Sequence, residues 1–281
     1  MVLDAILISV TIIALLIASY TDLKVREVPD WLSYGLIFAA LGIRSIFAIN
    51  YSTDIFISGL LGLAVCMGLA YLLYYTHQWG GGDSKLLMAM GAVIGIQFPF
   101  NNGSFTVLWF FLAMLFLGAI YGIFWMFYLA LKRRSVFWPK LKETLGEYKN
   151  VQWFLLAFTF VLTIIGFWYH FAFLGIFPAV IFYLIIFVNT VEDSCFLRQT
   201  KPKDLTEGDW LAEDVVIKKK SVMPKKTLDY QDLKTLRALH RQGKINTVLI
   251  KEGIPFVPSF LFAYLTILFI KDFSVLLMGM I

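Results

Sequence analysis

The chain has 281 residues, of which 59% are hydrophobic, 17% aromatic and only 15% charged, and its net charge is +5. A soluble domain is about half apolar and a quarter charged, so this composition predicts a polytopic membrane protein. The basic residues lie in short polar gaps, which indicates membrane orientation and argues against nucleic-acid binding. A zinc site is disfavoured, because the chain has two cysteines, three histidines and no HExxH motif.

Long apolar segments dominate the chain. A membrane-spanning helix needs about 20 mainly apolar residues, and eight segments approach that length. In chain order they are residues 3–21, 31–49, 54–76, 85–100, 104–131, 151–169, 171–190 and 256–270 or beyond. The third contains small residues that favour close helix packing, namely Gly59, Gly62, Ala64, Gly68 and Ala70. We therefore predict an all-α polytopic membrane protein with about eight transmembrane helices.

The polar stretch 191–255 has the pattern of a small folded unit. Leucines at helical spacing follow Thr227, a candidate N-cap, and precede Gly243, a candidate helix end. Residues 215–217 and 247–250 have the composition of short strands. We predict a small cytosolic α/β domain near the C-terminus.

These patterns divide the chain into three parts. A shorter polar stretch, residues 132–150, is expected to be a cytosolic loop. The predicted domains are a transmembrane helical domain, 1–190, the cytosolic domain, 191–255, and a C-terminal transmembrane helix, 256–281.

Lysine and arginine predict the orientation, because cytosolic loops retain them. With the N-terminus outside the cell membrane, the cytosolic segments are 22–30, 77–85, 132–150 and 191–255. They contain all of the 24 Lys and Arg residues except Arg44 and Lys271. These two lie near predicted outer ends, where long cationic side chains can snorkel.

Two acidic residues stand next to helix ends on the predicted cytosolic face. Asp22 directly follows the first apolar segment, and Asp83 follows three glycines just before the fourth. Two carboxylates held close together cannot both ionise easily. One then stays protonated while the other accepts a proton from water, as in aspartic proteases. Each residue also has a simpler interpretation, Asp22 as a helix-end charge and Asp83 as an N-cap in a glycine turn.

The surroundings of the two aspartates resemble motifs of the type IV prepilin peptidase family, which are GxGD membrane aspartic proteases, and especially its archaeal prepilin and preflagellin branch. The first motif is matched by Asp22, Lys24, Val28, Pro29 and Asp30. The second is matched by Gly80, Gly82, Asp83, Ser84 and Lys85. A third similarity is Ile254-Pro255-Phe256-Val257-Pro258, which leads into the last apolar segment.

The resemblance implies an aspartic endopeptidase that removes the basic leader from prepilin-like or preflagellin (archaellin) precursors at the cytosolic membrane face. It implies Asp22 and Asp83 as the catalytic residues, membrane lipid and a precursor with a hydrophobic helix as partners, and no cofactor, metal or nucleic acid. Active-site support is expected from Gly80, Gly82, Lys24, Lys85, Pro29 and Asp30. The two lysines either hold the aspartates or mark the cytosolic side. Because no CxxC pair occurs, we expect no methyltransferase activity.

Two other functions fit parts of the sequence. A presenilin-like or signal-peptide-peptidase-like intramembrane protease also carries Gly-x-Gly-Asp, but this chain has no Pro-Ala-Leu segment. A cation or proton transporter would place charges near the membrane midplane, whereas here the aspartates lie at predicted helix ends. The leader peptidase explains more of the pattern than either.

Overall fold

The structure is a computed structural model that describes residues 2–76, 78–100, 102–217 and 220–269. It divides into two compact units, one formed by residues 1–123 and 254–281 and the other by residues 124–253. Lys271 and the rest of the predicted C-terminal helix beyond residue 269 lie outside the described residues.

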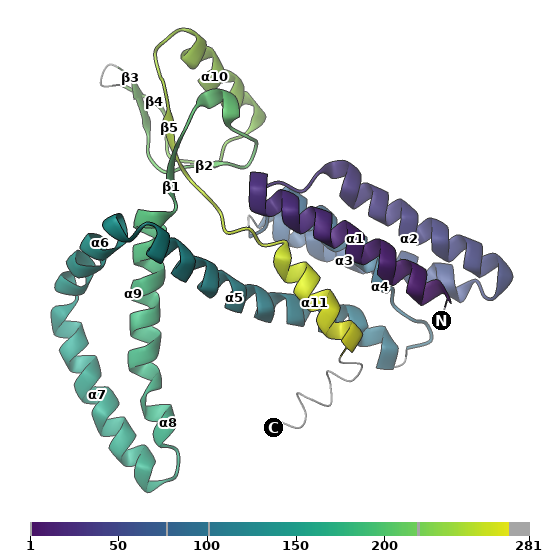
Figure 1. Cartoon of the computed structure of the whole chain (residues 1–281), viewed down its shortest axis with the longest axis horizontal. Helices are drawn as coiled ribbons and strands as arrows, with labels where there is room; N and C mark the ends of the chain where they lie inside the picture. The colour runs from purple at the N-terminus through teal and green to yellow at the C-terminus, as the bar shows by residue number, and fades with distance from the viewer. Residues whose placement is uncertain (1, 77, 101, 218–219, 270–281) are drawn as a thin grey trace. The chain divides into compact units, whose positions relative to one another are not determined.

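The first unit is a helical bundle (Figure 1). Its elements are α1 (Val2–Val25), α2 (Asp30–Asn50), α3 (Asp54–Tyr75), α4 (Gly81–Ile94), the 3-10 turn η1 (Asn102–Phe105), the first part of α5 (Thr106–Lys132), and α11 (Pro258–Phe269). α4 packs against α2 and α3, and α1 packs against α2 and α11. Elements from both ends of the sequence therefore build one bundle.

The second unit combines helices with a small α/β region. Its helices are α6 (Arg134–Glu147), α7 (Lys149–Trp168), α8 (Ala172–Gly175), α9 (Phe177–Cys195), the 3-10 turn η2 (Pro202–Asp204) and α10 (Tyr230–Arg241). Its strands are β1 (Leu197–Thr200), β2 (Trp210–Leu211), β3 (Val215–Ile217), β4 (Lys220–Met223) and β5 (Val248–Lys251). β5 lies between β1 and β2 in an antiparallel sheet, and β3 pairs with β4.

The α/β region follows the sequence prediction in most details. The predicted strands correspond to β3 and β5, and Gly243 follows α10 with a φ of +67°. The N-cap differs, since Asp229 and not Thr227 caps α10, through a reciprocal capping box with Asp232. A carboxylate three residues before a second acidic side chain can satisfy two helix-end donors at once. Leu236 of α10 is fully buried in the core of this region.

The expected loop at 132–150 is mostly helical, because α6 occupies residues 134–147. Polar composition marks exposure and does not by itself exclude a helix. Lys140 and Glu143 form an ion pair one helical turn apart at 3.0 Å, which supports an exposed helix.

Six helical segments of the described residues are long and apolar enough to cross a membrane. They are α1, α2, α3, residues 103–132, α7 and residues 173–195. Two further predicted spans are shorter helices in the structure: α4 has 14 residues and α11 has 12 described residues. The prediction of a helical polytopic membrane protein with a small α/β region is confirmed at this level.

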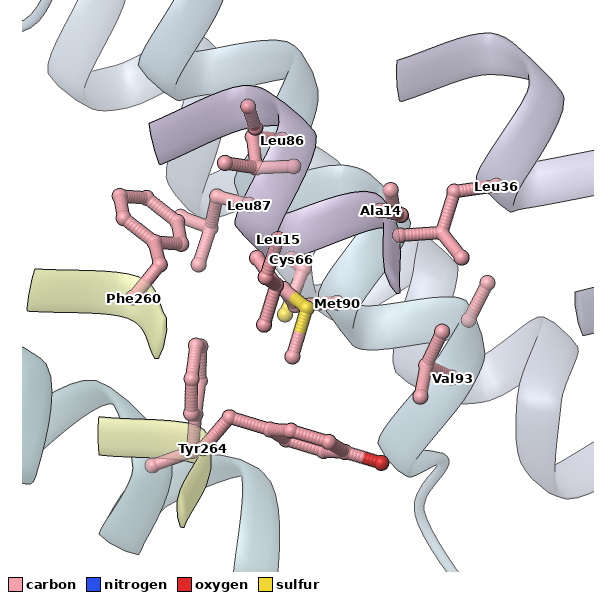
Figure 2. Packing of buried hydrophobic residues seen from close by; sticks show 14 of the residues in the cluster. Ala14, Leu15, Leu36, Cys66, Leu86, Leu87, Met90, Val93, Phe260 and Tyr264 are labelled. Atoms are coloured by element: carbon pink, nitrogen blue, oxygen red, sulfur yellow. The ribbon is translucent and has the colours of Figure 1, made fainter. Parts of the chain in front are cut away.

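The core of the first unit is centred on α4. Figure 2 shows side chains from α1, α2, α3, α4 and α11 that gather in this core: Ala14, Leu15, Leu36, Cys66, Leu86, Leu87, Met90, Val93, Phe260 and Tyr264. Leu86, Leu87 and Met90 of α4 are fully buried. The helix that carries Asp83 is therefore an interior element of the bundle.

The α3–α4 contact depends on glycine. A Cβ on Gly62 would collide with the carbonyl oxygen of Gly91, and a Cβ on Gly91 would lie 2.6 Å from Cβ of Cys66. Not all of the predicted packing residues take part, since Gly68 has no neighbour within 4 Å of such an atom and Ala64 is exposed. Gly68 and Ala64 do not contact α4, because successive residues of a helix point to different faces.

Arg44 is buried in the bundle and does not snorkel as the sequence suggested. Its side chain is 7% exposed. The guanidinium donates hydrogen bonds to the carbonyl oxygens at the end of α4, those of Ala92 (3.0 Å), Val93 (2.7 Å) and Ile94 (3.1 Å). Last-turn carbonyls have no partner within a helix, and here Arg44 supplies one.

Candidate active site

Asp22 lies in the last turn of α1, and its side chain is buried. Its Oδ2 accepts a hydrogen bond of 2.9 Å from the backbone N–H of Val257, which directly precedes α11. The backbone amide of Phe256 and the side chain of Arg26 also interact with this carboxyl. Asp22 therefore has partners that favour a negative charge, although it is removed from bulk water.

Arg26 directly follows α1 and has an unusual backbone conformation. Its φ is +62°, in the left-handed region that non-glycine residues seldom adopt, and its N–H donates to the carbonyl oxygen of Asp22 at 3.0 Å. Tyr121 of α5 interacts electrostatically with both Asp22 and Arg26. An arginine, a phenol and a carboxyl group are thus coupled electrostatically at this end of α1.

Asp83 lies in the first turn of α4, after Gly80, which is the N-cap residue in an extended conformation. The residue is half-buried, and the desolvation of its carboxyl raises the pKa of Asp83 to about 7, with the nearby charge of Asp22 as the second cause. The two aspartates are therefore close enough to influence each other's ionisation. A carboxyl with such a pKa holds a proton near neutral pH.

Two contacts join the segments that follow Asp22 and surround Asp83. Lys85 forms an ion pair of 2.6 Å with Asp30, the first residue of α2. A Cβ on Gly82 would lie 3.3 Å from Cβ of Val28, so the two backbones approach closely there. The predicted motifs, about 60 residues apart in the sequence, are neighbours in the structure.

The aromatic residue before the glycines is fixed in the bundle. The ring of Trp79 lies 6.3 Å from that of Phe111, 5.6 Å from that of Phe256 and 5.9 Å from that of Phe260. Because aromatic pairs at these separations are stabilising, Trp79 ties the glycine segment to the start of α11.

The supporting residues predicted from the sequence fall into two groups. Gly80, Gly82, Pro29, Asp30 and Lys85 lie at the junction of the two motifs: Pro29 is the N-cap of α2, and Lys85 contacts Asp30 and lies 5.7 Å from the ring of Tyr34. Lys24 is exposed, and its ammonium lies over the ring of Tyr20, 5.6 Å from the centroid. Lys24 is thus placed against an aromatic face on its own helix.

Four residues that interact with Asp22 were not predicted from the sequence to do so. Arg26 and Tyr121 are single residues without a motif of their own, and Phe256 and Val257 belong to a segment noted only for its resemblance. The N–H of Val257 is a backbone group, which residue type does not reveal. Only the fold brings residues 22 and 257 together.

The arrangement can perform acid–base chemistry on a water molecule. It has one carboxyl that accepts a hydrogen bond from a backbone amide and a second whose pKa, raised to about 7 by burial, lets it carry a proton near neutral pH. Such a pair can remove a proton from water and donate one to a carbonyl oxygen.

Comparison with known proteins points to one family. The sequence profile described as "Type IV leader peptidase family" matches residues 9–123. A preflagellin peptidase of Methanococcus voltae is 33% identical over 159 residues, which are 51% of this chain and 67% of that protein. Preflagellin peptidases of Methanococcus maripaludis and Methanocaldococcus jannaschii are 32% and 40% identical over shorter regions, 42% and 35% of their lengths. No solved structure matches the chain.

Proposed function

Because this chain belongs to the type IV leader peptidase family, we propose that Asp22 and Asp83 are the two catalytic carboxylates of its leader-peptide cleavage. The chain is an aspartic-type leader peptidase with several membrane-spanning helices. The observation that carries the proposal is the electrostatic coupling of the two aspartates at adjoining helix ends in the matched part of the bundle.

In the proposed reaction, the ionised carboxylate takes a proton from a water molecule while the water oxygen attacks the carbonyl carbon of the scissile peptide bond. The protonated carboxyl gives its proton to the carbonyl oxygen, and a tetrahedral intermediate forms. The intermediate then collapses: the C–N bond breaks as the nitrogen takes the proton that the first carboxyl received from water, and a hydroxyl of the intermediate returns a proton to the second carboxyl. The pair returns to one charged and one neutral carboxyl, so the cycle is balanced.

The substrate in this proposal is a prepilin-like or preflagellin precursor whose basic leader precedes a hydrophobic helix. The curated relatives act, by name, on preflagellin. We place the N-terminus outside the cell membrane and the aspartates at its cytosolic face, with residues 85–100 and the last helix completing eight spans. The lysine and arginine distribution supports this orientation.

Cleavage of a preflagellin precursor by membranes that contain the full chain tests the proposal. Asp22→Asn and Asp83→Asn should each abolish processing, because asparagine cannot exchange a proton in this cycle. The matched control is Asp54→Asn, an exposed aspartate in the first turn of α3, which should process normally. Normal cleavage by either active-site variant would refute the catalytic assignment. Cleavage only inside the hydrophobic helix would refute the leader-peptidase specificity.

A further inference from the structure

The segment Ile254–Pro258, before and at the start of α11, contacts both halves of the active site. We propose that it fixes the roles of the two aspartates: the N–H of Val257 holds Asp22 as the ionised base, which leaves Asp83 as the proton donor. This inference rests on the proposed catalytic function and deepens it. Val257 is a positioning residue that acts through its backbone.

The polar partners of Asp22 favour a negative charge and act against the desolvation of its buried carboxyl. The hydrogen bond from Val257 comes from the N-terminal end of α11, where the helix dipole favours an anion. Among the described residues, the charged and titratable groups given as interacting electrostatically with the carboxyl are Arg26, directly after α1, Tyr121 of α5 and Asp83 of α4. Of these only Arg26 is cationic, so arginine and amide together select Asp22 for the charge.

The surroundings of Asp83 favour the proton. Desolvation is the main cause that raises the pKa of Asp83 to about 7, and the charge of Asp22 adds to it. Two neighbouring carboxyls share a proton according to which of them is better stabilised as an anion. With the amide directed at Asp22, the shared proton resides on Asp83.

Two prolines determine which amides the segment can offer. Pro255 and Pro258 have no N–H, so the donors between them are those of Phe256 and Val257, and both interact with Asp22. Pro258 also suits the first position of a helix, where its fixed φ is helical. The prolines thus fix the backbone on either side, and the two amides between them interact with the Asp22 carboxylate.

Aromatic packing holds this segment against the glycine loop. The ring of Phe256 lies 5.6 Å from that of Trp79 and 6.0 Å from that of Phe260. A Cβ on Gly118 of α5 would collide with the Phe256 ring, so the ring is enclosed from that side as well. The Phe256 ring therefore packs against the segment that leads to Asp83, while the N–H of the next residue, Val257, donates to Asp22.

An amide-to-ester change at Val257 tests the proposal in the full-length membrane protein. It removes the N–H and keeps the side chain. We expect kcat to fall about tenfold or more with little change in KM, because a hydrogen bond to a charged group is lost, and the acidic limb of the pH–rate profile to move to higher pH. The control is the same change at Leu265 within α11, which removes a helix bond away from the aspartates and should leave the profile in place.

Phe256→Leu provides a second, conventional variant that keeps every N–H. It loosens the segment against Trp79, and we expect the same displacement of the acidic limb with a smaller loss of kcat. A wild-type kcat and pH profile in the ester variant would overturn the inference, as would an unshifted limb in Phe256→Leu. Failure of the proposed function is distinguished by Asp22→Asn, which would then remain active.

Discussion

Replacement of Arg44 by methionine should cost more stability than any other single change at a charged residue of the bundle. The guanidinium makes five hydrogen bonds: to the carbonyl oxygens of Ala92, Val93, Ile94 and Ile55, and to Ser58 Oγ at 2.7 Å. The fourth orphan carbonyl of α4, that of Gly91, accepts from the N–H of Gly95 at 2.9 Å. Arg44 therefore satisfies every remaining acceptor at this helix end.

The magnitude follows from what the methionine leaves behind. Hydrogen bonds to a charged group contribute about 1.5–3 kcal/mol each, but such values do not add. The methionine leaves several buried acceptors unsatisfied, at about 1–3 kcal/mol each, and because these costs do not add in full we expect a total of about 4 kcal/mol for Arg44→Met. Arg44→Lys keeps the charge but offers three donors from a single point, so it should cost about half as much.

The free energy of unfolding in mixed detergent micelles measures this cost, with Lys132→Met as the control. Lys132 is exposed, with its ammonium 5.5 Å from the ring centroid of Tyr128, and should lose less than about 0.5 kcal/mol. Hydrogen exchange at the end of α4 should accelerate only in the Arg44 variants. A loss below about 1 kcal/mol in Arg44→Met would refute the role of this residue as the cap of α4.

Three further outcomes are expected. Gly62→Ala should destabilise the bundle by about 2 kcal/mol through overpacking. Gly68→Ala meets no neighbour, so its effect on stability should be neutral or slightly favourable. Thermal unfolding in micelles compares the two variants. The rate of cleavage should fall tenfold per pH unit above about pH 7, because the pKa of Asp83 is raised to about 7 and the reaction needs its proton. A rate that stays constant from about pH 6 to about pH 9 would contradict this prediction. Asp229→Ala should destabilise α10 by about 1 kcal/mol, and Thr227→Ala should not, as hydrogen exchange of the α10 amides will report.

The sequence predicted the parts of the fold that local patterns determine. Apolar length identified the long helices, and strand composition identified β3 and β5. The positive-inside rule counts charges along the chain but carries no information on burial, so the sequence led to the prediction that Arg44 snorkels near an outer helix end and did not reveal its contacts with α4. Similarly, the run of small residues in α3 did not show that Gly62 faces α4 and Gly68 does not.

The candidate site was predictable to the extent that its motifs are contiguous. Asp22 and Asp83 each stand in a recognisable stretch, and the structure places these stretches in contact through Lys85 and Asp30. The bond from Val257 to Asp22 joins groups 235 positions apart and uses a backbone atom. Neither spacing nor residue type can indicate such a contact, which depends on α1 and α11 packing side by side.

The length of α4 explains why the bundle contains a buried arginine. Its 14 residues extend about 21 Å, less than the roughly 30 Å of a bilayer core. In the proposed orientation, a helix that carries Asp83 in its first turn at the cytosolic face ends inside the apolar layer, where its last carbonyls have no water. Arg44 supplies their partners there, while the Lys85–Asp30 pair holds the opposite end against α2. The same helix α2 thus fixes α4 at both ends, which positions Asp83 along the membrane normal.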